Sequence, residues 1–202
     1  MFGLVESGSI TKMLSGNRGI TLGDVQYPQA IFTLWSAAER EAIGIYKVEY
    51  DNTNKKDEQW YINTNQWFAF AGGKVTASYG TATAKPHANT LFTAQDESNG
   101  LGTEGEVKAE GLKTIKIREV KLQAAGILQD TDWYVVRKAD AGTAVPSAIT
   151  THRAAVRTKC AEMETAITNA ADTSALETLY TYTEQEDGSV TRPLGELPRL
   201  DS

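Results

Sequence analysis

One stretch decides the fold of this 202-residue chain: Ile127-Leu128-Gln129-Asp130-Thr131-Asp132-Trp133-Tyr134-Val135-Val136-Arg137-Lys138. It lies between two segments of helical periodicity and brings aromatic, apolar and oppositely charged side chains into one short connector. Connectors are usually polar, so a connector built around Trp133 indicates a junction that needs an anchor. We therefore expect two helices to fold back on each other here, with Trp133 plugging the open end of the helical hairpin.

The segment after the connector carries the strongest pattern in the chain. Apolar residues recur at alternating steps of four and three, which predicts an a/d seam along one face of a long helix. The seam consists of Ile149, Arg153, Val156, Cys160, Met163, Ile167 and Ala170. Arg153 interrupts this apolar seam and therefore needs an acceptor. We predict that Asp130 or Asp132, the nearest acidic residues in the connector, pairs with Arg153 or Arg157.

The segment before the connector predicts a second helix, from about residue 105 to 128, with a weaker apolar stripe. The stripe consists of Ile117, Val120, Ala124 and Ile127. Gly111 and Gly126 each weaken such a helix by roughly 1 kcal/mol, so packing must hold it together. The pattern leaves open whether the seam packs within one chain or between chains. Further on, Ser174-Ala175-Leu176-Glu177 predicts a capped short helix that ends near Leu179.

Residues 1–85 are predicted to be β-rich, because glycines separate short apolar or alternating runs. The run Ile45–Tyr50 alternates apolar and polar residues and is expected to form a hairpin or meander with the run Gln59–Asn63. Ala71-Gly72-Gly73-Lys74 predicts a second turn. One short helix is expected where Ser36-Ala37-Ala38-Glu39 forms a capping box, and Gly44 is placed to end it.

Large aromatic side chains are numerous in this first region. We expect them to form the core of a small β domain: Trp35, Trp60, Trp67, Phe68 and Phe70. An exposed row of the same side chains would instead stack on sugar rings or bases. Aromatic residues at alternating strand positions are more often core residues, so the core interpretation is preferred.

The fold class predicted from these patterns is α+β. A β-rich domain with one short helix is followed by a linker rich in glycine, asparagine and serine, then by a helical hairpin with a further short helix, and last by an extended tail. The predicted boundaries are 1–85 for the β-rich domain, 86–104 for the linker, 105–183 for the helical hairpin domain and 184–202 for the C-terminal arm.

Charge and composition argue against several kinds of partner. The net charge of −6 disfavours contacts with nucleic acid, which need clustered lysine and arginine. No apolar run approaches the length of a membrane span, and the start of the chain does not resemble a secretory signal. Cys160 is the single cysteine, so it forms no disulfide within the chain and is expected to be a buried thiol.

No constellation of residues suggests catalysis. Neither His87 nor His152 has a companion in a metal-ligand motif, and no GxSxG, P-loop or GxGxxG motif is present. The carboxylate pairs Asp57-Glu58 and Glu184 with Glu186 lack the buried apolar setting that an acid catalyst needs, so they are interpreted as solvated turns. We therefore expect no enzyme activity, no metal and no cofactor.

The stretch from Leu128 to Lys138 resembles the LxxTDWYVxR pattern found near the C-terminus of many tailed-bacteriophage tail proteins. Its sequel, Val145–Arg157 followed by Leu176–Tyr180, resembles the same group, which includes tail-fibre, tail-fibre-assembly and baseplate-associated proteins. The segments Gly19–Pro28 and Trp35–Ile45 are similar to the start of phage virion proteins. Together these stretches cover about half of the chain.

The resemblance implies a structural component of a phage tail, assembled in the host cytoplasm and located in the virion. A short adaptor of fibre or baseplate fits better than a complete fibre. Other tail proteins are then its partners, in a symmetric homo-oligomer that is a trimer or a hexamer. The alternatives are a tail-fibre assembly chaperone and a module that binds host glycans. The residues expected to form the docking module are Trp133, Asp130, Asp132, Arg137, Arg153, Arg157, Ile149, Val156, Met163 and Ile167.

Overall fold

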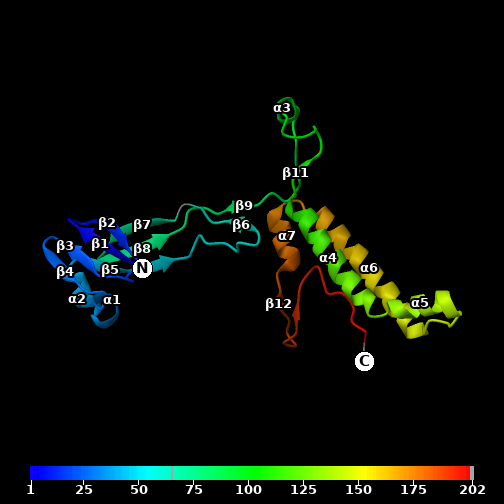
Figure 1. Ribbon diagram of the computed structural model, residues 1–202. Coiled ribbons are helices and arrows are strands. Elements are labelled where there is room, and N and C mark those ends of the chain that lie inside the picture. Colours follow the sequence, from blue (N-terminus) through cyan, green and yellow to red (C-terminus); the bar gives the residue numbers. More distant parts are fainter. Residues whose placement is uncertain (65, 201–202) are drawn as a thin grey trace. The chain divides into compact units, whose positions relative to one another are not determined.

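The computed structural model describes residues 1–64 and 66–200 and has the predicted α+β class. Two compact units divide the chain, Met1–Thr83 and Ala84–Ser202. The first unit is rich in strands and the second is mainly helical, as Figure 1 shows. Within the first unit the structure places two short helices, α1 (Ile31–Leu34) and α2 (Ala37–Glu41), where one was predicted.

A five-stranded sheet forms the first unit. In spatial order it consists of β2 (Ser9–Leu14), β1 (Phe2–Glu6), β5 (Ile45–Asp51), β8 (Lys74–Ser78) and β7 (Trp67–Ala71). Neighbouring strands are antiparallel except β5 and β8, which are parallel. The predicted pairing of Ile45–Tyr50 with Gln59–Asn63 is wrong, because β6 (Tyr61–Ile62) pairs with β9 (Thr83–Ala84). Strand β1 takes that place on β5 because it sets Leu4 opposite Ile45, an apolar pair that both strands bury.

Each face of this sheet has its own apolar cluster. On one face, Leu4 and Ile45 pack with residues of β2 and α1, and the ribbon of β3 (Ile20–Leu22) and β4 (Val25–Tyr27) adds partly buried residues. On the other face, Val75 packs with Val48 and Ala77, among partly buried residues of β1, β2, β5 and β7. The edge strands β2 and β7 also lie against each other, so the sheet curls around this second cluster.

Local signals in the first unit are confirmed where turn chemistry determines them. Ser36 and Glu39 form the predicted capping box of α2, and Gly44 follows with φ of 78°. Gly72 and Gly73 have φ of 56° and 76° and connect β7 to β8. Two successive residues with positive φ match the twist of a two-residue hairpin, which glycine adopts without steric cost.

The aromatic core prediction holds in part. Trp60 is buried, and Trp35, Phe68 and Phe70 are partly buried against the two clusters. Trp67 is 48% exposed, so its assignment to the core is wrong. Side chains alternate along a strand, and in β7 the inward positions belong to Phe68 and Phe70.

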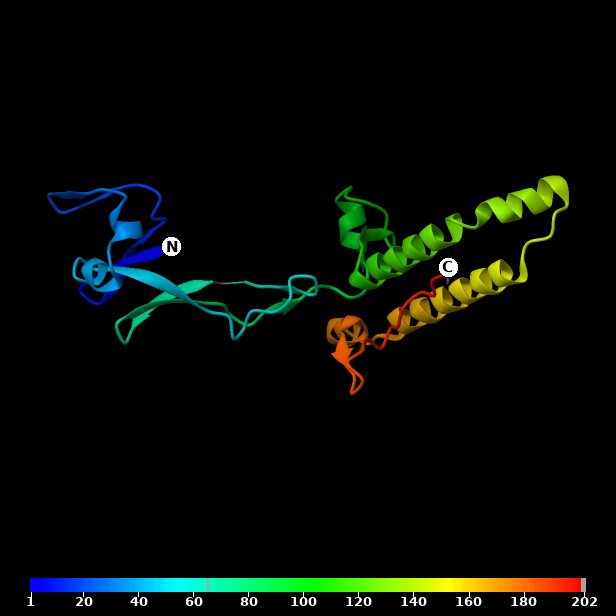
Figure 2. The same cartoon turned by 90° about the horizontal axis from the view of Figure 1, so that it is seen from below.

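The longer helices of the second unit are α4 (Leu112–Gln129), α5 (Asp132–Ala141), α6 (Ser147–Asn169) and α7 (Thr173–Tyr180). Figures 1 and 2 show α4 and α6 side by side, with α5 at one end of the pair and α7 at the other. Every predicted seam residue, from Ile149 to Ala170, is buried. The seam packs against α4 of the same chain, which answers the question that the sequence left open.

The buried face of α4 differs from the predicted stripe. It steps by four through Leu112, Lys116, Val120 and Ala124, while Ile117 and Ile127 are only half-buried. Lys116 is on this face because its ammonium group has partners, an ion pair with Glu119 at 2.8 Å and the Tyr180 ring at 5.3 Å. Its aliphatic stem can then cover apolar surface as a leucine would.

Residues 86–104, predicted as a linker, contain ordered elements. Strand β10 (Thr90–Leu91) pairs with β11 (Val107–Ala109), and α3 (Ala94–Ser98) lies between them with a Thr93–Asp96 capping box. The helix predicted from residue 105 therefore begins later, at Leu112. We call residues 90–109 the β10–β11 excursion.

The end of the chain packs against its own helices. Strands β12 (Thr183–Glu184) and β13 (Val190–Thr191) form a hairpin, after which Leu194 is buried and donates its backbone N–H to the Leu179 carbonyl at 3.0 Å. The predicted arm thus orders along α7. That helix is capped by Asp172, whose carboxylate accepts from the Ala175 N–H at 2.8 Å, and not by Ser174 as expected.

Candidate functional site

Residues 127–138 are largely helical. Helix α4 ends at Gln129 and α5 begins at Asp132, so the predicted connector is a break between two helices. The turn towards α6 falls later, after Gly142, which has φ of 69°. Asp132 in the first turn of α5 and Lys138 in its last turn suit the helix dipole, which favours the helical form over a loop.

Arg153 of α6 fixes this break. Its Nη1 donates to the Leu128 carbonyl and to Thr131 Oγ1, both at 2.7 Å, and its Nη2 lies 2.8 Å from Asp132 Oδ1. The predicted pairing of Arg153 with a connector aspartate is confirmed, and Asp132 is the partner. At the end of α4 the guanidinium shares the Leu128 carbonyl with the Thr131 backbone N–H, at 3.1 Å, and the Thr131 hydroxyl, at 2.9 Å.

Trp133 does not plug the hairpin. Its side chain is 51% exposed, and its ring centroid lies 3.8 Å from the ring centroid of Tyr134. The Arg137 guanidinium lies 4.6 Å from the Trp133 ring centroid. The predicted role was wrong because Arg153 and the buried Thr131 already occupy the junction. Val135 and Val136 are also exposed. We call residues 133–138 the α5 tip, and its exposed apolar side chains have the character of a contact surface.

Beside the α5 tip lies a cavity of about 320 Å³. Its lining consists of Val135, Lys138, Ala144, Val145, Thr150, Arg153 and Arg157. Arg153 is committed to Asp132, whereas Lys138 and Arg157 form no ion pair with any residue in 1–64 or 66–200. The basic cavity, as we name it, therefore carries two uncompensated positive charges between apolar walls.

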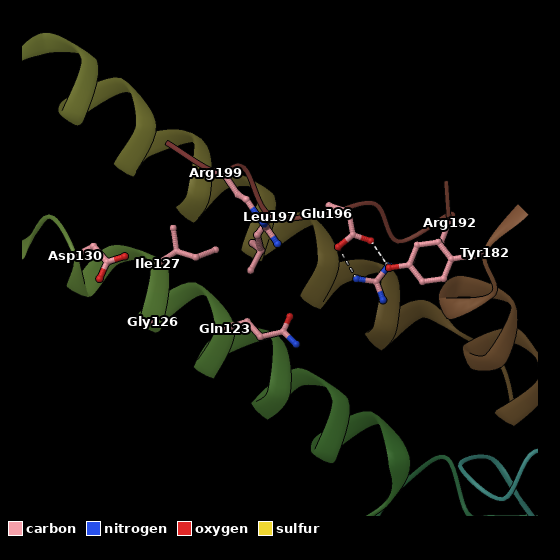
Figure 3. Close-up of a pocket in the computed structure, with 9 residues that line it drawn as sticks. All are labelled: Gln123, Gly126, Ile127, Asp130, Tyr182, Arg192, Glu196, Leu197 and Arg199. Carbon is pink, nitrogen blue, oxygen red and sulfur yellow. Dashed lines mark hydrogen bonds and ion pairs between the residues drawn. The ribbon is translucent and has the colours of Figure 1, made fainter. Parts of the chain in front are cut away.

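A second cavity, of about 920 Å³, is drawn in Figure 3 between α4 and the segment that follows α7. Three of its polar side chains bond to one another, since Tyr182 donates to Glu196 Oε1 at 2.6 Å and Arg192 forms an ion pair with the same carboxylate at 2.8 Å. The hydrogen bond to Glu196 raises the pKa of Tyr182. Asp130 lines this cavity, whereas the carboxylate that reaches Arg153 belongs to Asp132.

The cysteine and one of the two histidines lie in the packed interior of the protein. Cys160 is a buried free thiol on the seam, and burial raises its pKa. His152 is also buried. Among the residues that the structure describes, no three histidine, cysteine, aspartate or glutamate side chains form a group suited to a metal ion. Within the same ranges, no helix has both the length and the apolar character needed to cross a membrane.

Comparisons of the chain with protein-family models, with curated proteins and with solved structures found no match. The α5 tip and the basic cavity are thus defined by geometry alone. The cavity was not foreseen from the sequence, because Lys138 and Arg157 belong to different helices and only the turn after Gly142 brings them together.

Proposed function

We propose that this chain is a non-enzymatic structural component of a tailed-phage virion, a tail adaptor that joins neighbouring tail components through its α5 tip. The support in the sequence is the resemblance of residues 128–138 to the LxxTDWYVxR pattern of tail proteins. The support in the structure is that some residues of this pattern hold the helices together while others are exposed to solvent.

The inner residues of the pattern hold the hairpin together, and the outer ones face solvent. Leu128, Thr131 and Asp132 supply the three acceptors of Arg153. Trp133 and Val136, by contrast, are 51% and 65% exposed. Apolar groups held on a rigid support and left in contact with water are typical of a surface that a partner covers. This exposure is the single observation that carries the proposal.

The division of the chain also suits an adaptor. Each unit has its own buried cluster, so each can keep its fold while it contacts a different tail component. Several copies in a symmetric ring, a trimer or a hexamer, follow from the symmetry that phage tails impose on their parts.

Mass spectrometry of purified particles of the phage whose genome encodes this chain tests whether the chain is part of the virion. We expect the chain in the particles, and we expect Trp133→Ala to reduce its incorporation severalfold. Leu122→Ala is the matched control, because Leu122 is an exposed apolar residue of α4 outside the tip. If the chain is missing from finished particles, the adaptor is excluded and the assembly chaperone is favoured.

One observation supports a second candidate, a host-glycan module. Trp67 of β7 is exposed on the outer face of the sheet, as a side chain that stacks on a sugar ring would be. Tryptophan fluorescence during titration with host polysaccharide tests it. A saturable shift in the wild type that Trp67→Ala abolishes would support glycan binding, and an unchanged spectrum would exclude it.

A further inference from the structure

The basic cavity calls for an acidic occupant. Lys138 and Arg157 face it without a carboxylate partner among the described residues, and Val135 and Val145 form apolar walls beside them. Charge-assisted hydrogen bonds are stronger than neutral ones, and both cations are exposed and so open to a partner. A carboxylate carried next to an apolar side chain matches such a lining.

The chain itself carries such a segment. The turn of the β12–β13 hairpin presents Glu184, Glu186 and Asp187, all exposed, and neither glutamate has an ion pair within residues 1–64 and 66–200. The turn has a defined shape, because Gln185 N–H donates to the Ser189 carbonyl at 2.8 Å and Asp187 accepts from Ser189. Val190, 62% exposed, adds an apolar side chain beside the carboxylates.

The cavity and the turn belong to opposite ends of the second unit. The cavity lies where α6 begins, and the hairpin follows α7, which packs near the end of α6. Both views show α5 and α7 at opposite ends of the helix pair (Figures 1 and 2). Helix α6 has 23 residues. Its length is therefore roughly 34 Å at a rise of about 1.5 Å per residue. A contact between the two surfaces consequently joins two copies.

We propose that the acidic β12–β13 turn of one copy docks into the basic cavity of a second copy, so that copies associate head to tail. The proposal rests on the α5 tip being the docking surface of the proposed function, and it names the occupant. A contact between two different surfaces of identical chains closes into a ring if the rotation allows, or continues as an open array if it does not.

Sedimentation analysis of the full chain at low and high salt tests the contact. At about 0.05 M salt we expect association that increases with protein concentration, and at about 1 M salt, where the screening length is about 3 Å, we expect it to be lost. Lys138→Glu with Arg157→Glu, and separately Glu184→Lys with Glu186→Lys, should each weaken association by at least about a hundredfold.

The decisive step is to mix the two reversed variants. Each now offers the charge that the other lacks, so the mixture should associate where neither variant does alone. Two control pairs make the same changes of net charge at exposed sites elsewhere, Lys12→Glu with Lys47→Glu and Glu104→Lys with Glu106→Lys. Circular dichroism of every variant excludes misfolding as the cause of lost association.

Three outcomes overturn the inference: a monomer at low salt, association that ignores both reversals, or a mixture that fails to associate. A monomer at low salt would instead favour an acidic segment of another tail protein as the occupant of the basic cavity. None of the three outcomes contradicts the proposed adaptor function if the chain is found in particles. Conversely, rescue in the mixture supports head-to-tail association even if the chain is missing from particles.

Discussion

A single guanidinium connects α4, the break after it, and the start of α5. Arg153 donates to one backbone carbonyl, one hydroxyl and one carboxylate, and its side chain is almost fully buried. A buried cation that has lost its water is retained only where fixed acceptors replace that water. The geometry at this residue therefore sets the direction in which the α5 tip leaves the helix pair.

Replacing this residue tests the junction directly. Arg153→Met keeps most of the volume and the apolar stem but removes the donor to Thr131 Oγ1 and Asp132, while the Leu128 carbonyl keeps the Thr131 N–H and hydroxyl. Because Asp132 is partly solvated, we expect a loss of about 1–3 kcal/mol in the free energy of unfolding of the second unit. Urea unfolding followed by helical circular dichroism measures it. Arg157→Met, on the same helix but exposed, should change stability by less than about 0.5 kcal/mol. Equal or greater stability of Arg153→Met would show that the contacts of Arg153 with Leu128, Thr131 and Asp132 do not stabilise the fold.

Cys160 provides a second test at the scale of one residue. Its thiol is buried on the seam and burial raises its pKa, so both access and thiolate content are low. A thiol-specific reagent should modify native protein at least about a hundredfold more slowly than unfolded protein. Ala161→Cys in a Cys160→Ala background places the thiol on the exposed neighbour and should react at close to the unfolded rate. Fast modification of native Cys160 would contradict the packing of the seam.

At the scale of elements, the regular patterns were predictable and the exceptions have physical causes. The α6 seam, the capping box at Ser36 and the glycine turn at Gly72 depend on local spacing and turn chemistry, which the sequence states directly. The partner of β5 is β1, far away in the chain, and no local pattern encodes such a choice. The burial of Lys116 on α4 was not predictable from spacing, because it depends on Glu119 and Tyr180 together.

The residues of the α5 tip and the basic cavity likewise divide into features that were predictable from the sequence and features that were not. Asp132 was identified as a partner of Arg153 because a charge on an apolar seam requires a nearby acceptor. The exposure of Trp133 was not predictable, because an aromatic residue in a junction has the same sequence signal whether it plugs the junction or projects from it. The basic cavity forms because the turn after Gly142 brings α5 and α6 together, and the composition of the chain does not predict that arrangement.

The β10–β11 excursion makes a prediction about pH. Lys108 and Thr93 hydrogen-bond the Asp96 carboxylate and lower its pKa to about 2, from an ordinary value of 3.8. Because the pKa is lower in the folded state, the stabilisation is complete above pH 3.8 and is lost as the pH falls towards about 2. An NMR titration of side-chain carboxyls should find Asp96 protonating near the lower value.

The matched variants separate this carboxylate from general charge effects. Asp96→Asn should weaken the order of α3 at neutral pH, seen as faster amide exchange from Ala94 to Ser98. Glu106→Gln, an exposed acid in the same excursion, should not. A titration midpoint of Asp96 at its ordinary value would show that the contact with Lys108 does not persist in solution.

At the scale of the whole molecule, two separate cores predict two unfolding events. Ile45 is fully buried in the first unit and Met163 almost so in the second. Truncating either to alanine should cost about 2–5 kcal/mol. Differential scanning calorimetry should then show one transition lowered by on the order of 10 °C, a different one in each variant. If both transitions shift together in either variant, the units unfold as one.

The curled sheet of the first unit has a consequence for aggregation. Strands β2 and β7 would be its two open edges, yet they lie against each other. An open edge is a template on which strands of neighbouring chains add and start aggregates, and a covered edge removes that template. Because β2 and β7 face each other, this sheet offers neighbouring chains less open edge for β-pairing, even when the protein is concentrated.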